Sequence, residues 1–156
     1  ENLMIVDLMR NDLSIACEPA SIRVESLLAV KSYSTLHQLV SDVSGELRVD
    51  KNGLDALLAL LPGGSMTGAP KLSAIEILSN LEVGARAGYS GGIGWIDANW
   101  NMDLGMVIRT AVFSKDRVSI GIGGGITSDS IPEAEHEEIV LKSNALVRTL
   151  GAQVSW

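Results

Sequence analysis

The residues best suited to chemistry lie near the end of the sequence, where a glycine-rich stretch leads into an acidic one. The stretch 121–125 contains four glycines, whose backbone can turn sharply and bring its N–H groups close to a ligand. Pro132 suits the first turn of a helix, and a helix N-terminus favours negative charge. At about 100° per residue, Glu135, Glu138 and Lys142 then fall within one narrow arc of that helix. This pattern predicts one half of a site for an anion and a metal ion.

The same residues also have an ordinary structural interpretation, and residue type alone does not decide between the two. Acids are common in a first helical turn, and a Glu138–Lys142 pair at i,i+4 is frequent on helix surfaces. If the segment binds a metal, carboxylates without clustered cysteine or histidine favour a hard cation such as Mg²⁺. Glu138 would then be a ligand and Glu135 a direct or water-mediated one, and a further carboxylate from elsewhere would be needed.

Two further side chains are candidates for holding an anionic ligand. Arg109 stands in the apolar stretch 106–112, which predicts a charge in the middle of a strand. Such a charge pairs with a buried acid or, as we favour, binds an anionic ligand through both arms of its guanidinium. Tyr89 precedes a cluster of glycines that would let another group come close. A tyrosine packed in the core is an equally good interpretation of Tyr89 from the sequence.

The remaining polar residues carry weaker signals. His37 is a single histidine at the start of a predicted strand, where structural roles are more common than catalytic ones. Cys17 has no evident base nearby, so we expect an unreactive thiol. Residues 62–71 resemble a phosphate-binding loop only superficially, because the Gly-Lys-Ser/Thr order is missing. Four polar residues on the first predicted helix have helical spacing, so we expect them to pair with one another and to be structural; they are Asp7, Arg10, Asn11 and Asp12.

Hydrophobic periodicity and breaker residues predict the elements that must position these groups. Helices are predicted at residues 1–16, 50–61, 70–81 and 131–150, with Pro70 as the first helical residue of the third. Strands are predicted in two stretches between residues 22 and 47, and at 89–97, 104–113 and 117–122. Short connections favour antiparallel pairing, and strands grouped in blocks favour an α+β fold, a largely antiparallel sheet flanked by helices.

Composition narrows the class of protein. The 156 residues are 46% hydrophobic and carry a net charge of −7, which suits one globular domain and disfavours a general nucleic-acid surface. A single cysteine rules out an internal disulfide framework and a metal–thiolate cluster. The apolar runs are too short to span a bilayer and no leader is evident, so we expect a cytoplasmic protein without a membrane partner.

Several segments, taken together and in order, resemble the C-terminal part of the chorismate-utilising enzymes, which include aminodeoxychorismate, anthranilate, isochorismate and salicylate synthases. The matching stretches are residues 1–13, 62–71, 89–94, 101–103 with 108–110, and 123–142. The resemblance implies the family's α+β chorismate-binding fold. It also implies that residues 1–156 form the C-terminal part of a single domain whose N-terminal part is missing.

The resemblance implies a role for each candidate residue. Glu1 and Glu138 would be Mg²⁺ ligands, with Glu135 in direct or water-mediated support. Tyr89 and Arg109 would hold the enolpyruvyl carboxylate of chorismate. The amides of the glycine loop would donate to substrate carboxylates, through Gly123, Gly124 and Gly125. Lys142 would add positive charge beside the metal, and His37 would lie near the departing ring hydroxyl.

The resemblance also implies a reaction. Residues 62–68 are similar to the version found in aminodeoxychorismate synthases, which favours conversion of chorismate and ammonia to 4-amino-4-deoxychorismate, a precursor of 4-aminobenzoate and folate. The ammonia would come from a glutamine amidotransferase subunit or domain. Anthranilate synthase component I and a non-catalytic truncated fragment are the alternatives. The family's lysine in a Pro-Ile-Lys-Gly-Thr-type motif has no counterpart here, so we expect the isolated chain not to turn over chorismate.

Overall fold

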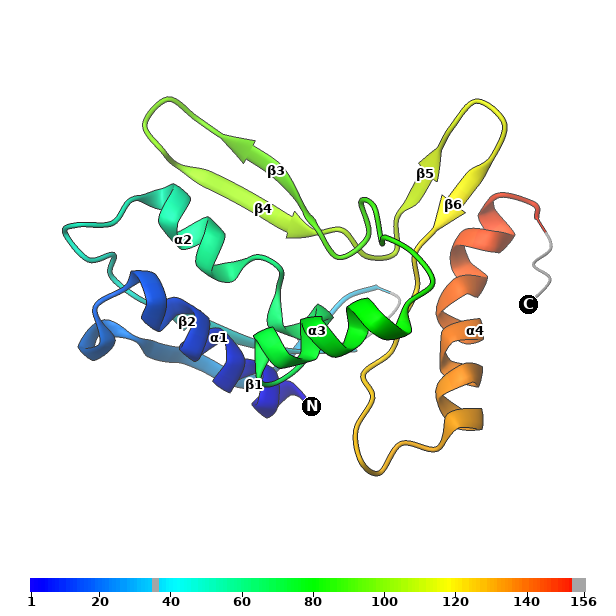
Figure 1. The fold of residues 1–156 in the computed structure, drawn as a ribbon, viewed down its shortest axis with the longest axis horizontal. Helices are drawn as coiled ribbons and strands as arrows, with labels where there is room; N and C mark the ends of the chain where they lie inside the picture. The colour runs from blue at the N-terminus through cyan, green and yellow to red at the C-terminus, as the bar shows by residue number, and fades with distance from the viewer. Residues whose placement is uncertain (35–36, 153–156) are drawn as a thin grey trace. The chain divides into compact units, whose positions relative to one another are not determined.

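The computed structural model describes residues 1–34 and 37–152, and these form two compact units. The first unit comprises residues 1–83 and 94–104, and the second residues 84–93 and 105–156. Figure 1 shows the order of the elements along the chain. The prediction that residues 1–156 are part of a single domain stays a prediction.

Helix α1 (Asn2–Ala16) carries the best-buried residues of the first unit, and its predicted end near residue 16 is confirmed. Val6, Asp12 and Ala16 are the buried positions of the helix, and Cys17 directly after it is buried as well. The helix ends where Cys17 turns to an extended conformation while its N–H still donates to Leu13 O. Within the described part of the chain, Val6, Ala16 and Cys17 are the buried hydrophobic residues, so the core of this unit is centred on α1.

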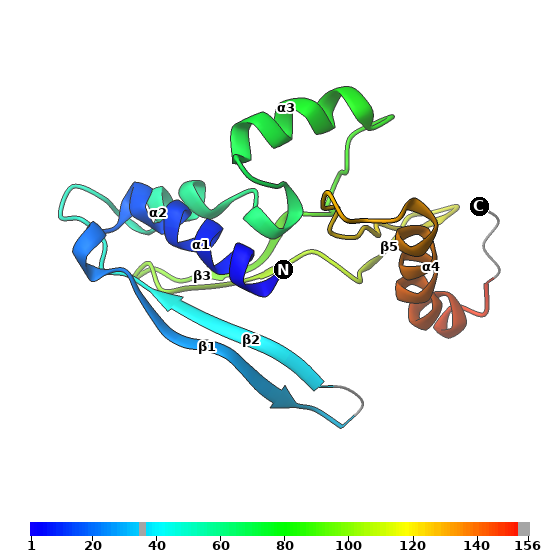
Figure 2. The same ribbon diagram turned by 90° about the horizontal axis from the view of Figure 1, so that it is seen from below.

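The two strands predicted between residues 22 and 47 are confirmed as β1 (Arg23–Ser32) and β2 (His37–Ser44). They pair antiparallel, from Arg23 opposite Ser44 to Ser32 opposite His37. Figure 2 shows them as a long two-stranded ribbon. Asn2 of α1 joins the ribbon, because its Nδ2 donates to Leu39 O at 3.4 Å and its Oδ1 accepts from Ser41 Oγ at 2.7 Å.

Two more helices of this unit, α2 (Gly53–Leu60) and α3 (Lys71–Leu81), lie inside their predicted ranges. Helix α2 begins at a capping box, in which Asn52 Oδ1 accepts from Leu54 N and Asp55 Oδ2 accepts from Asn52 N. A short 3₁₀ helix, η2 (Gly64–Met66), lies in the breaker segment. The prediction for Pro70 was wrong by one position, because its extended ψ of 141° makes it the N-cap and Lys71 the first helical residue.

The strands after residue 84 are shorter than predicted. β3 (Gly92–Ile96) and β4 (Met102–Met106) form one hairpin, and β5 (Ala111–Phe113) and β6 (Val118–Ile120) pair antiparallel in another. The predicted strand over 104–113 was therefore wrong as a single element. Arg109 has a φ of +49°, which lies outside the extended conformation of regular strands, and the chain leaves the strand conformation between β4 and β5.

The last helix, α4 (Pro132–Thr149), begins with Pro132 in its first turn as predicted. Helices combined with antiparallel strands confirm the predicted α+β class. Among the described residues, the strands form three separate two-stranded sheets rather than one sheet. No helix in residues 1–34 and 37–152 has both the length and the apolar character needed to cross a membrane.

Candidate anion and metal site

Tyr89 and the glycine loop meet in the second unit. The ring of Tyr89 lies against Gly121 so closely that a Cβ placed there would come within 2.6 Å of the ring's Cδ2. A Cβ at Gly123 would lie 2.8 Å from the tyrosine hydroxyl oxygen. Only glycine fits these two positions without displacing the ring. The structure thus brings together two of the groups that the sequence assigned to substrate binding.

Tyr89 is placed by a turn rather than by a strand. Ala87 and Ser90 on either side of it adopt left-handed φ values of +54° and +72°, which are uncommon for residues with a Cβ. Ser90 is buried, and its N–H donates to Val107 O at 3.0 Å. Strained conformations persist where the surroundings fix them, and here they aim the Tyr89 ring at the loop.

The acidic start of α4 faces the same loop. A Cβ at Gly124 would lie 3.3 Å from Glu135 Oε2 and 4.0 Å from Glu138 Oε1, so both carboxylates border this glycine. The other oxygen of Glu135 accepts from Ser130 Oγ at 2.6 Å. Lys142 forms an ion pair with Glu138 and approaches Gly123 O at 3.5 Å. The predicted edge of Glu135, Glu138 and Lys142 beside the glycine loop is confirmed as an arrangement.

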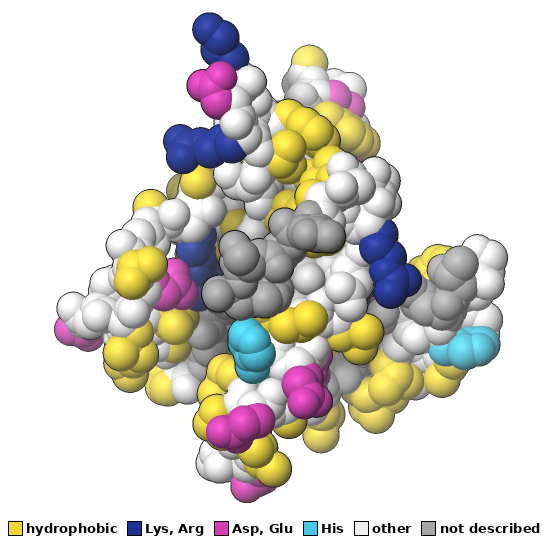
Figure 3. Space-filling view, turned by 90° about the vertical axis from the view of Figure 1, so that its right-hand side faces the viewer, with side chains coloured by type: hydrophobic (Ala, Val, Ile, Leu, Met, Phe, Trp, Pro, Cys, Tyr) yellow, Lys and Arg dark blue, Asp and Glu magenta, His cyan; other side chains and the backbone are white. Residues whose placement is uncertain are grey.

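Negative charge gathers on this part of α4. The acids of its first two turns are Glu133, Glu135, Glu137 and Glu138. Figure 3 shows acidic side chains grouped on the lower part of the face that it draws. A helix N-terminus stabilises such charge, and Lys142 compensates part of it.

The two carboxylates at Gly124 fit the ligand set of Mg²⁺. The ion typically takes one or two protein carboxylates and leaves its remaining positions to water and substrate oxygens. Glu135 Oε2 and the Glu138 carboxylate are such hard oxygen donors, and the missing side chain of Gly124 keeps the space beside them open. Among the described residues no group of three or more acidic, histidine or cysteine side chains is poised for a metal, so the fit rests on this pair.

Arg109 does not lie inside a strand as predicted. It is exposed in the break between β4 and β5, and within the described part of the chain no acid pairs with it. The prediction of a charge buried in a strand was wrong, because the left-handed backbone at Arg109 turns it out of the sheet. The alternative of a buried acidic partner is removed with it, and binding of an anionic ligand stays a prediction.

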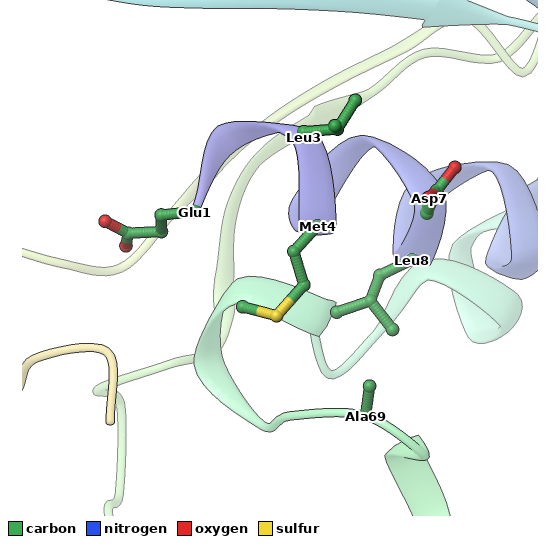
Figure 4. Close-up of a pocket in the computed structure, with 6 residues that line it drawn as sticks. All are labelled: Glu1, Leu3, Met4, Asp7, Leu8 and Ala69. Carbon is green, nitrogen blue, oxygen red and sulfur yellow. The ribbon is translucent and has the colours of Figure 1, made fainter. Parts of the chain in front are cut away.

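His37 and Glu1 belong to the first unit, and their predicted roles stay predictions. His37 is the first residue of β2, is exposed, and shares a 2.9 Å hydrogen bond between its Nδ1 and Ser32 Oγ. Glu1 borders an open pocket of about 550 Å³ along α1, lined also by Leu3, Met4, Asp7, Leu8 and Ala69. Figure 4 shows its carboxylate directed away from the apolar side chains of Met4 and Leu8.

One ion pair of the first unit was missed from the sequence. Lys71 Nζ lies 2.7 Å from Asp12 Oδ2 and also donates to Ala59 O at 3.3 Å. Four polar residues of α1 were predicted to pair with one another. The pairing of Asp7 with Arg10 is confirmed at 3.1 Å, but the prediction for Asp12 is wrong, because its partner is Lys71. Asp12 lies on the buried face with Val6 and Ala16, so its partner must come from another element. The spacing of Asp12 and Ala16 was the available signal, because residues four positions apart lie on the same face of a helix and Ala16 is on the buried face.

Cys17 is buried where the chain leaves α1, next to Gly45. Burial raises the pKa of its thiol, and the positive charge of Arg48 offsets only part of that rise. A thiol held in its neutral form is a poor nucleophile, which supports the expectation of an unreactive cysteine.

Comparison with known proteins places this geometry in a family. A family model described as chorismate binding enzyme matches residues 1–148. Aminodeoxychorismate synthase, chloroplastic, of Arabidopsis thaliana is 50% identical over 145 residues, which is 93% of this chain and 16% of that protein. Anthranilate synthase component 1 of Aquifex aeolicus is 43% identical over 150 residues, which is 96% of this chain and 30% of that protein.

A solved structure shares the fold. The crystal structure of anthranilate synthase component I from Streptococcus pneumoniae superposes with a TM-score of 0.85 at 36% identity, covering 92% of this chain and 33% of that one. This chain spans between about a sixth and a third of the length of these relatives. Because the family model extends over residues 1–148, the chain belongs to the family of chorismate binding enzymes.

Proposed function

We propose that this chain is the C-terminal segment of an aminodeoxychorismate synthase component I, which converts chorismate and ammonia to 4-amino-4-deoxychorismate and water. The observation that carries the proposal is the convergence of Tyr89, the glycine loop and the carboxylate–lysine edge of α4 in one compact unit. The 50% identity to the Arabidopsis aminodeoxychorismate synthase supports this product over anthranilate. The reaction would serve 4-aminobenzoate and folate synthesis in the cytoplasm, with ammonia from a glutamine amidotransferase partner.

The task of the chain's own residues is to hold a dianion in place. Chorismate carries two carboxylates, and the protein has a net charge of −7, so positive potential must be concentrated locally. The amides of the glycine loop, the Tyr89 hydroxyl and the Arg109 guanidinium would donate hydrogen bonds to those carboxylates. Lys142 would place its ammonium group beside them. Donors held in a fixed geometry need no reorganisation as charge develops on the ring carboxylate.

By the family resemblance, Glu138 and Glu1 would be the Mg²⁺ ligands, with Glu135 in direct or water-mediated support. When bound, Mg²⁺ would supply Lewis-acid polarisation of the ring carboxylate. Lys142 forms the ion pair with Glu138, and it would shift toward the substrate's negative charge when a divalent cation takes the carboxylate. The role proposed for His37 is to donate a proton to the departing ring hydroxyl, so that water leaves.

A product assay on the encoded full-length protein tests the proposal. With chorismate, Mg²⁺ and ammonium, we expect a product that an added aminodeoxychorismate lyase converts to 4-aminobenzoate. A fluorescent product formed without the lyase would be anthranilate and would replace the proposed function by anthranilate synthase component I. No product from the full-length protein would favour a non-catalytic role.

The 156-residue chain by itself is expected to be inactive. It contains no Pro-Ile-Lys-Gly-Thr-type lysine motif, and it covers only 16% of the length of the Arabidopsis relative. The same assay on the isolated chain should give no aminodeoxychorismate above a blank without protein. Measurable product would overturn this expectation.

A further inference from the structure

We propose that Arg86 is a positioning residue that holds Tyr89 against the glycine loop, and this inference rests on the proposed function of that loop as a chorismate site. Arg86 lies at the start of the turn that carries Tyr89, and both belong to the second unit. No role follows for Arg86 from the chemistry described above. Its contacts nevertheless connect it to every part of the turn.

The guanidinium of Arg86 lies over the tyrosine ring. Its Cζ is 5.9 Å from the centroid of the Tyr89 ring, within the range at which a cation is attracted by the face of an aromatic ring. The backbone supports this approach, because Tyr89 N donates to Arg86 O at 3.1 Å. One side of the ring therefore meets Arg86, while Gly121 and Gly123 lie against the tyrosine as well.

Arg86 is itself fixed by a buried hydroxyl. Its Nη1 donates to Ser90 Oγ at 3.0 Å, and Ser90 is only 7% exposed. The N–H of Ser90 donates to Val107 O, which ties the turn to the residue that directly follows β4. The left-handed backbone at Ala87 and Ser90 brings Arg86 back over the ring. Arg86 and Ser90 thus form a brace across a strained turn, with Tyr89 between its ends.

The brace has a consequence for ligand binding. A tyrosine hydroxyl can donate to a carboxylate only if the ring is held at the correct angle, and small displacements of positioning groups are costly. A cation over the ring also makes the hydroxyl a better hydrogen-bond donor, since it draws electron density toward the ring face. Arg86 would therefore raise the affinity for an anionic ligand without touching it.

The test uses 3-fluorotyrosine, because the chain has only two tyrosines, Tyr33 and Tyr89. The ¹⁹F resonance of Tyr89 is assigned by its loss in Tyr89→Phe. We expect Arg86→Gln to shift or broaden this resonance and to leave that of Tyr33 unchanged. Arg86→Lys, which keeps the charge and loses the planar fork, should give an intermediate shift. Ser90→Ala should resemble Arg86→Lys.

Arg117→Gln is the matched control, since it removes an exposed arginine of the same unit whose side chain makes no hydrogen bond or ion pair among residues 1–34 and 37–152. It should leave both resonances in place. An unchanged Tyr89 resonance in folded Arg86→Gln and Ser90→Ala would overturn the proposal. If Arg86→Gln does not fold, Arg86→Lys and Ser90→Ala decide: a shifted Tyr89 resonance in both supports the proposal, and an unchanged one in both overturns it.

Titration with chorismate and Mg²⁺ separates this inference from the proposed function. We expect chorismate to shift the Tyr89 resonance of the unmodified chain, with about fivefold to tenfold weaker binding in Arg86→Gln. If chorismate leaves Tyr89 unshifted while Arg86→Gln shifts it, the proposed contact of Tyr89 with chorismate fails and the positioning role holds, and the product assay on the full-length protein decides the reaction separately. If chorismate binds both forms equally, the positioning role fails and the proposed function stands.

Discussion

The Asp12–Lys71 pair of the first unit and the Glu138–Lys142 pair of the second differ far more in burial than in chemistry. In the first unit the side chains of Asp12 and Lys71 are 1% and 16% exposed, whereas in the second those of Glu138 and Lys142 are 49% and 34% exposed. A buried ion depends on its partner, while water solvates a half-exposed ion whether or not it is paired. The difference teaches that Asp12–Lys71 fixes the fold, whereas Glu138 and Lys142 can exchange partners with a ligand.

The largest expected effect comes from breaking the buried pair on one side. Asp12→Asn leaves the Lys71 ammonium without its counter-charge, and removing one partner of a buried pair costs about 3–5 kcal/mol. Urea unfolding of the chain should show this loss as a lower midpoint. Glu138→Gln is the matched change in the other pair and should move the midpoint little. Equal shifts in the two variants would contradict the contrast between the pairs.

A double substitution shows whether stability requires the buried ion pair itself, or only requires that neither charge is left buried without its partner. Asp12→Leu with Lys71→Met removes both charges and keeps apolar volume. Replacing a buried ion pair in this way is often neutral or stabilising, so the double variant should recover most of the stability lost in Asp12→Asn. A double variant as unstable as Asp12→Asn would mean that the contact of Lys71 with Ala59 O carries the effect.

The next effect concerns the loop beneath the exposed pair. Gly121→Ala would force its Cβ into the Tyr89 ring, and such overpacking costs about 1–3 kcal/mol. Thermal or urea unfolding measures the loss. Gly84→Ala is the control, because a Cβ at Gly84 meets nothing within 4 Å. A Gly121→Ala variant as stable as the control would show that the Tyr89 ring is not tightly packed on the glycine loop and can move aside for a methyl group.

A smaller effect on stability, with a large effect on binding, is expected for the exposed pair itself. Glu138→Gln and Lys142→Met should each change the free energy of unfolding by less than about 1 kcal/mol. Isothermal titration should show Mg²⁺-dependent chorismate binding weakened about tenfold or more by Glu138→Gln. Glu137→Gln, one residue away on α4, is the control for the loss of an acid. Undiminished binding in Glu138→Gln would remove this residue from the proposed site.

The sequence predicted those parts of the fold and site in which neighbours along the chain are also neighbours in space. The Glu138–Lys142 pair lies one helical turn apart, and the proline start of α4 and the antiparallel pairing of β1 with β2 follow local rules. The approach of the glycine loop to α4 was predictable for the same reason, since only a few residues separate them.

The failures have the opposite character. Asp12 and Lys71 are 59 positions apart, and a buried acid seeks its partner wherever the fold supplies one. Arg109 was misplaced because its left-handed φ is a backbone feature that an apolar sequence pattern does not display. Tyr89 was ambiguous between core and site because its position depends on a turn built from unusual conformations at Ala87 and Ser90.

The smallest expected effect concerns an acid that has no lysine at all. Asp97, in the turn between β3 and β4, accepts from Asn101 Nδ2 at 2.8 Å and from the N–H groups of Asn99 and Asn101. The side-chain hydrogen bond from Asn101, followed by these backbone bonds, holds the pKa of Asp97 below the ordinary value of 3.8. Because the folded pKa is lowered, the stabilisation is present above that ordinary value and is lost as the pH falls through the lowered pKa. An NMR titration should place the midpoint below 3.8 and show it rising in Asn101→Ala, whereas Asn144→Ala should leave it unchanged. A midpoint that does not respond to Asn101→Ala would contradict the role of this side chain and would mean that the backbone donors alone stabilise the Asp97 carboxylate.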